Sequence, residues 1–264
     1  APATSQYDGT SNAMSAVGDV DAANGSGDAW NARLLSDAPA AFDFFVLHPY
    51  DFTVDDDARI RLAERARKTV RDLRATAPDK QVAITEYGFL FNGGTLLNAI
   101  VTADMTRMAI EEQLLLCVRH ILIETDPTGP FADSAAIGPS LALEPGYLAS
   151  SLVRRLQPIA LVASPPNASL VDDGSLVALP TRDAATQHLA VLFVDRRVDD
   201  GPARTVHVTL PSSARFALHA STLTAGTLED TDVTVADADL GVASDHVAVA
   251  VPAHSVVILS ADAQ

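Results

Sequence analysis

The sequence predicts two units, an α/β unit over residues 1–158 and an all-β unit over residues 159–264. In the first unit, three short and nearly continuous apolar runs alternate with segments whose apolar residues recur at helical spacing, which is the pattern of a parallel sheet covered by helices. In the second unit, short runs of alternating apolar and polar residues are separated by turn clusters, a pattern typical of an antiparallel β-sandwich of about 100 residues. The hinge between the units is expected near residues 158–166.

The first unit begins with loop composition and then repeats strand and helix three times. Residues 1–27 are rich in Gly, Ser, Asn and Ala, and a short helix is expected over residues 28–35. The run 42–48 is almost wholly apolar, as expected for a strand that is buried on both faces. Acidic residues at 55–57 are start signals for the helix that follows. The later elements are a strand over 81–87, a helix with apolar residues from 97 to 115, a strand over 118–124, a long loop, and a helix over 146–156.

Six short strands are predicted in the second unit, over residues 175–179, 188–194, 204–210, 216–223, 246–251 and 255–259. Many of them alternate apolar and polar side chains, so one face of each strand is expected in the core. Clusters of Asp, Gly and Pro between the strands, such as residues 199–202, supply the turns.

Polar residues end all three predicted strands of the first unit. These residues are His48, Glu86 and Glu124. The carboxyl ends of parallel strands meet at one edge of the sheet, and in β/α barrels and other parallel α/β folds that edge carries the active site. Glu86 is the most informative of the three, because a charge directly after a buried strand costs several kcal/mol unless partners compensate it.

The residues around Glu86 resemble the nucleophile strand of retaining glycoside hydrolases that are built on a (β/α)8, or TIM, barrel. The segment Ile84-Thr85-Glu86-Tyr87-Gly88, together with His48-Pro49-Tyr50 and the closing run Pro252-Ala253-His254-Ser255-Val256-Val257-Ile258-Leu259, resembles families 51 and 39. The opening residues 1–4 are similar to those that leave the fifth barrel strand. The resemblance implies a partial barrel, strands six to eight with their helices, followed by the β-sandwich, and it covers only the C-terminal half of the family.

The resemblance also implies roles for the residues at the strand ends. Glu86 would be the catalytic nucleophile, and Tyr50 is expected to donate a hydrogen bond to it, or else to form an aromatic wall of the pocket. His48 would bind a sugar hydroxyl or orient Glu86, or else be a core histidine. Tyr87 is expected to contact the substrate.

Two acidic residues near the end of the third predicted strand complete the candidate site. Glu124 and Asp126 are expected to contact the substrate, or else to pair with Arg119 or His120 or remain solvated in a loop. Family members often carry a tryptophan at this point, where this chain has residues 124–126 instead.

A retaining glycosidase needs a second carboxyl group as its acid/base, and the strand that would carry it is absent from this sequence. The resemblance therefore implies a partner, the N-terminal half of the barrel, and a carbohydrate substrate cleaved by double displacement. The first expectation is an α-L-arabinofuranosidase, followed by a β-xylosidase or another exo-acting enzyme. The alternative is a non-catalytic remnant that binds carbohydrate or a protein.

Composition excludes other classes of function. The formal net charge of −16 would repel nucleic acid and anionic membranes, and no run of 18 apolar residues predicts a membrane span. The single cysteine, Cys117, excludes an internal disulfide and is expected to be buried and inert. The histidines are dispersed and no glycine-rich phosphate loop is present, so neither a metal nor a cofactor is predicted. Cellular location stays open between cytoplasm and secretion.

Overall fold

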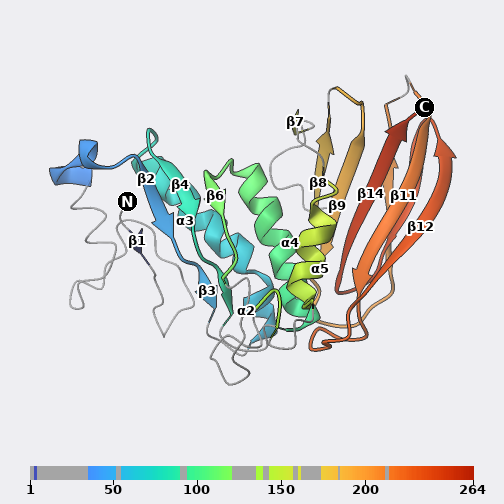
Figure 1. The fold of residues 1–264 in the computed structure, drawn as a ribbon, viewed down its shortest axis with the longest axis horizontal. Coiled ribbons are helices and arrows are strands. Elements are labelled where there is room, and N and C mark those ends of the chain that lie inside the picture. Colours follow the sequence, from blue (N-terminus) through green and yellow to red (C-terminus); the bar gives the residue numbers. More distant parts are fainter. Residues whose placement is uncertain are drawn as a thin grey trace.

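The structure is a computed structural model. It describes residues 3–4, 35–51, 55–89, 94–120, 135–138, 143–156, 160–161, 174–183, 185–211 and 214–264. Over these ranges the chain has a mixed α/β architecture with one parallel and one large antiparallel sheet, consistent with part of a glycoside hydrolase barrel followed by a β-sandwich. Figure 1 shows the parallel sheet and the antiparallel sheet at opposite sides of the molecule, with helices between them.

The parallel sheet has four strands in the order β1-β2-β4-β6. The strands are β1 (Ala3–Thr4), β2 (Phe44–Leu47), β4 (Gln81–Ile84) and β6 (Leu116–Cys117). Three consecutive residues are buried in each of β2 and β4, so both strands are covered on both faces, as predicted for the run 42–48. A pair of two-residue strands, β3 (Tyr50–Asp51) and β5 (Gly88–Phe89), continues the chain just beyond β2 and β4.

Helices cover the parallel sheet on the side that faces the antiparallel sheet (Figure 1). They are α2 (Asp56–Ile60), α3 (Leu62–Thr76), α4 (Leu96–Glu111) and α5 (Pro145–Val153). The predicted start signal is present, because the Asp55 carboxylate caps α2 by accepting from the backbone N–H of Asp57 at 3.1 Å. Residues on every side of α4 are buried, since α4 packs against other helices and against both sheets.

The antiparallel sheet has six strands in the order β12-β11-β14-β9-β8-β7. They are β7 (Ala160–Leu161), β8 (Leu176–Arg182), β9 (Leu189–Asp195), β11 (Phe216–Thr224), β12 (Thr234–Ala243) and β14 (Ser255–Ala263). Two further strands, β10 (Arg204–Thr209) and β13 (His246–Val251), pair with each other.

Both faces of the six-stranded sheet are buried at its inner strand β14. Val256 and Ile258 belong to the core that includes α4 and α5, whereas Val257 and Leu259 belong to a second core that includes residues of β13. Alternate residues of one strand therefore serve two layers, which explains why this run is continuously apolar.

Several predicted elements differ from the structure or lie outside it. The strand predicted over 118–124 begins earlier, since Leu115 N–H already bonds to the Val82 carbonyl, and residues 121–124 lie outside the described ranges. The helix preceding it ends at Glu111. β12 was not predicted. Most of the helix predicted over 28–35, and residues 157–159 at the predicted boundary, also fall outside the described ranges.

Within the described ranges, no helix combines the length and the apolar character that crossing a bilayer requires.

Candidate active site

Glu86 lies directly after β4, at the carboxyl end of the parallel sheet. The three residues before Thr85 are buried, whereas 42% of the Glu86 side chain is exposed. The backbone of β4 thus delivers the carboxylate from the core to an accessible position, where a reacting molecule can reach it.

Tyr50 holds the Glu86 carboxylate from the neighbouring strand. Tyr50 and Gly88 are register partners in the parallel pair β3–β5, so the tyrosine stands beside the segment that carries Glu86. Its hydroxyl donates a 2.8 Å hydrogen bond to Glu86 Oε2. Burial, followed by the hydrogen bond and the charge of Glu86, raises the pKa of Tyr50 above its ordinary value. The phenol therefore stays protonated and remains a donor at physiological pH.

His48 lies next to this pair but bonds to another residue. Its Nε2 is 2.7 Å from the Thr85 hydroxyl, whereas its Nδ1 is 3.9 Å from Glu86 Oε2. The histidine is half-buried, and Thr85 fixes the plane of its ring. The second ring nitrogen then lies on the side of Glu86, at a distance too long for a direct hydrogen bond.

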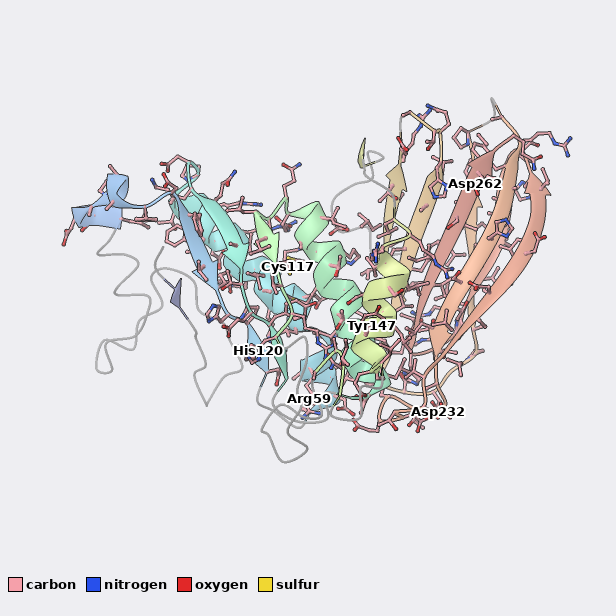
Figure 2. All side chains as sticks on the ribbon, in the orientation of Figure 1. Arg59, Cys117, His120, Tyr147, Asp232 and Asp262 are labelled. Carbon is pink, nitrogen blue, oxygen red and sulfur yellow. The ribbon has the colours of Figure 1, made fainter. Side chains whose placement is uncertain are left out.

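His120 joins the same group, although its site role was missed in the sequence. Its ring packs edge-on against Tyr50, with ring centroids 6.1 Å apart, and its backbone N–H bonds to the Tyr87 carbonyl at 3.0 Å. Figure 2 places it at the carboxyl end of the parallel sheet. The early start of β6 puts His120 opposite Tyr87. The available signal was a histidine two residues after the apolar run 114–118, and the later strand boundary obscured it.

Tyr87 is not brought to this group, which corrects the prediction that it contacts the substrate. Only 4% of the residue is exposed, and its hydroxyl bonds with Thr102 and Thr106 of α4 inside the helical core. Burial accordingly raises the pKa of Tyr87. The physical reason is the alternation of an extended chain, in which the residue after Glu86 points to the opposite face.

Glu124 and Asp126 lie outside the described residues. Arg119, one of the two partners considered for them, packs against Gly146 at the start of α5, where Glu144 supplies a compensating charge. A β-carbon on Gly146 would overlap the Arg119 guanidinium, so this glycine makes room for the arginine.

Asp51, the carboxylate nearest to Tyr50 in sequence, is already paired with an arginine. Asp51 is 3% exposed and forms an ion pair with Arg65 of α3. It is therefore a structural group and not a proton donor poised for catalysis.

Cys117 is half-buried, and burial raises the pKa of its thiol to about 12, so it carries no thiolate at neutral pH. No three His, Cys, Asp or Glu side chains in the described ranges are grouped as metal ligands.

Taken together, the group consists of one accessible carboxylate, a phenol that donates to it and two flanking imidazoles. An ionised carboxylate whose position is fixed by a donor can act as a nucleophile or as a base.

Solved structures that resemble this chain include glycoside hydrolases. An α-L-arabinofuranosidase from Thermotoga maritima, in complex with arabinose, aligns with a TM-score of 0.65 and 16% identity over 89% of this chain and 55% of that one. A family 51 α-L-arabinofuranosidase from Bifidobacterium longum aligns with a TM-score of 0.61 and 14% identity, over 88% of this chain and 55% of that one. A family 44 xyloglucanase from Paenibacillus polymyxa aligns with a TM-score of 0.56 and 10% identity, over 84% of this chain and 47% of that one.

The chain thus spans about half the length of these structures. At these identities, the structural similarity shows that this chain shares the fold of part of each of these glycoside hydrolases. No protein-family model matches the sequence, and no curated protein matches it.

Proposed function

We propose that this chain supplies the C-terminal part of the barrel and the following β-sandwich of a retaining glycoside hydrolase, with Glu86 as its nucleophile. In this proposal residues 1–158 contribute barrel strands six to eight and residues 159–264 form the sandwich. The observation that carries the proposal is the 2.8 Å hydrogen bond from Tyr50 to a half-exposed Glu86 at the carboxyl end of a parallel strand. Arabinofuranosidases among the structurally similar proteins support the proposal that the chain is part of a glycoside hydrolase.

The reaction would proceed in two displacements. Glu86 attacks the anomeric carbon while a carboxylic acid from outside this sequence protonates the leaving oxygen, which gives a glycosyl ester of Glu86. The same outside group, now a carboxylate, takes a proton from water, and the resulting attack on the anomeric carbon releases Glu86. Retention requires the two carboxyl groups to stand about 5 to 5.5 Å apart.

Tyr50 and His48 would position the nucleophile and the sugar. The Tyr50 hydroxyl occupies Oε2 of Glu86, which leaves Oε1 for attack. Because Thr85 holds Nε2 of His48, the other ring nitrogen can meet a sugar hydroxyl close to the anomeric carbon. Both residues would act before the chemical step, by reducing the freedom of the reacting groups.

The substrate we favour is a terminal α-L-arabinofuranosyl unit, with β-xylosides or other exo-cleaved sugars next. A second candidate function is a carbohydrate- or protein-binding module without turnover. This second candidate would hold if no carboxyl group from outside the sequence completes the site, because Asp51, the carboxylate next to Tyr50, is held by Arg65 and does not supply an acid/base group.

Hydrolysis of an aryl α-L-arabinofuranoside by the intact protein tests the proposal. We expect Glu86→Gln to lower kcat at least about 10³-fold with an unchanged circular dichroism spectrum, since removal of the nucleophile removes the covalent step. Asp43→Asn is the matched control, because Asp43 is an exposed carboxylate before β2, at the opposite end of the same sheet. Turnover retained in Glu86→Gln would refute the nucleophile assignment.

Trapping separates the two candidate functions. An activated 2-deoxy-2-fluoro-arabinofuranoside should add one glycosyl mass to the peptide that contains Glu86. Binding of arabino-oligosaccharide by the wild-type protein without turnover and without this adduct would identify the binding module instead.

A further inference from the structure

An open hollow lined by polar residues lies where the end of α5 meets the six-stranded sheet, remote in sequence from Glu86. Its volume is about 450 Å³. The lining residues come from α5 and the turn after it, from the residue just before β9, and from β11 and β14. They are Ser151, Arg154, Arg155, His188, His219, Ser260 and Asp262. Figure 2 labels Asp262 near the end of β14, beside the start of β9.

The basic character of this hollow is unusual for the chain. The sequence has 34 acidic residues against 18 lysines and arginines, so carboxylates are in excess. Buried arginines such as Arg107 and Arg196 are accordingly held by carboxylates. The guanidinium of Arg154, in contrast, is exposed and forms no ion pair or hydrogen bond with any residue that the structure describes.

The acidic groups around the hollow already have partners. Asp262 accepts from His188 Nδ1 at 2.5 Å. Asp237, which lies beside the hollow on β12, accepts from Arg155 at 2.9 Å and also from the Ser221 hydroxyl. Those two bonds, the hydroxyl contributing more, lower the pKa of Asp237 and keep its carboxylate ionised. The charge of Arg154 is therefore not cancelled by either carboxylate.

The position of Arg154 at the end of α5 does not explain why several other polar side chains line the same hollow. A cation at a helix C-terminus interacts favourably with the helix dipole, which accounts for one arginine. It does not account for the hydroxyls of Ser151 and Ser260 and the imidazole of His219, which reach the same hollow from a helix and from two different strands.

We propose that this hollow binds a small oxyanion, either inorganic phosphate or the carboxylate of an acidic sugar. Arg154 supplies the main charge contact, because its planar guanidinium can donate two parallel hydrogen bonds to such a group. The two serine hydroxyls add neutral donors, and the paired Arg155 shapes the wall. This site is separate from the group around Glu86, and its existence does not depend on glycosidase activity.

Isothermal titration of the intact protein at low ionic strength tests this proposal with three probes: sodium phosphate, sodium D-glucuronate and neutral D-glucose. We expect millimolar or tighter binding of at least one anion and none of glucose. Binding of phosphate alone or of glucuronate alone identifies the source of the oxyanion, and both results support the site. Failure of both anions to bind with a Kd below about 10 mM would overturn it.

Variants locate the binding. Arg154→Ala should weaken the anion at least about tenfold, whereas Arg154→Lys should keep part of the affinity because it retains the charge. Arg215→Ala is the matched control, since Arg215 is an exposed arginine that does not line the hollow. Circular dichroism confirms folding of each variant. Unchanged affinity in Arg154→Ala, or an equal loss in Arg215→Ala, would show non-specific attraction and refute the site.

Discussion

Arg196, directly after β9, forms a 3.2 Å ion pair with Asp104 in the middle of α4, and both side chains are at most 1% exposed. The same Asp104 carboxylate accepts from Arg107 at 2.7 Å, and Arg196 also reaches Glu64 of α3 at 2.6 Å. These contacts tie the six-stranded sheet to the helices that cover the parallel sheet. The six-stranded sheet and these helices are thus joined by a buried charge network as well as by apolar packing.

Asp104→Ala should destabilise the protein by about 3–5 kcal/mol, because it leaves the charges of Arg107 and Arg196 buried with fewer partners. Urea denaturation followed by circular dichroism measures the change. Lys68→Ala is the control, since Lys68 is 74% exposed and pairs with Asp72 on the surface, where an ion pair contributes less than about 1 kcal/mol. Equal effects of the two substitutions would contradict a structural role for the buried network.

Stability should fall as the pH drops below about 4, and Asp104 should contribute to that fall. Burial alone would raise the pKa of Asp104, but the charges of Arg107 and Arg196 outweigh it and hold the pKa below the ordinary 3.8. Below the ordinary value the unfolded chain binds a proton that the folded chain does not, so acid favours unfolding. The free energy of unfolding at pH 3, 4 and 7 should therefore vary less in Asp104→Asn than in the wild type. Parallel pH curves would exclude this contribution.

The strands that could be predicted from the sequence are those whose buried position requires apolar residues. β2 and β4 are apolar because both faces are covered, and the strands of the six-stranded sheet are bounded by turn residues. β12 was missed because nearly all its residues are exposed, so its pairing with β11 leaves little trace in the side chains. The start of β6 depends on which backbone groups of β4 it meets, and a continuous apolar run does not specify that register.

The same reasoning applies to the candidate site. Tyr50 and Glu86 could be paired from the sequence because each follows a neighbouring parallel strand, and the expected hydrogen bond is present. Tyr87 was misplaced because a motif match does not say which face a residue occupies. His120 was missed because its packing against Tyr50 is a tertiary contact between different strands.

Tyr50→Phe should lower kcat for an aryl arabinofuranoside by about 10- to 100-fold with a smaller change in KM, because it removes the hydrogen bond that positions Glu86 and keeps the ring. The unfolding midpoint in urea should change little. Tyr147→Phe is the matched control, since Tyr147 lies on α5 and no hydrogen bond within the described residues joins it to Glu86. A loss confined to KM, or an equal loss in the control, would show that Tyr50 does not position the nucleophile.

Gly88→Ala should disturb both stability and activity, because the added β-carbon would lie 3.0 Å from the backbone carbonyl oxygen of His120. Backbone cannot move aside as a flexible side chain can, so we expect a destabilisation of about 1–2 kcal/mol. The strain falls where Gly88 pairs with Tyr50, and kcat should drop together with stability. In the control Gly201→Ala, the new β-carbon meets Nη1 at the end of the Arg197 side chain at 2.8 Å. A small shift of this atom strains only its exposed hydrogen bond to the Pro202 carbonyl, so the unfolding free energy should change by less than about 1 kcal/mol. A Gly88→Ala protein as stable and as active as the control would mean that β5 and the segment after β6 are not in close contact, and that His120 does not belong to the group around Glu86.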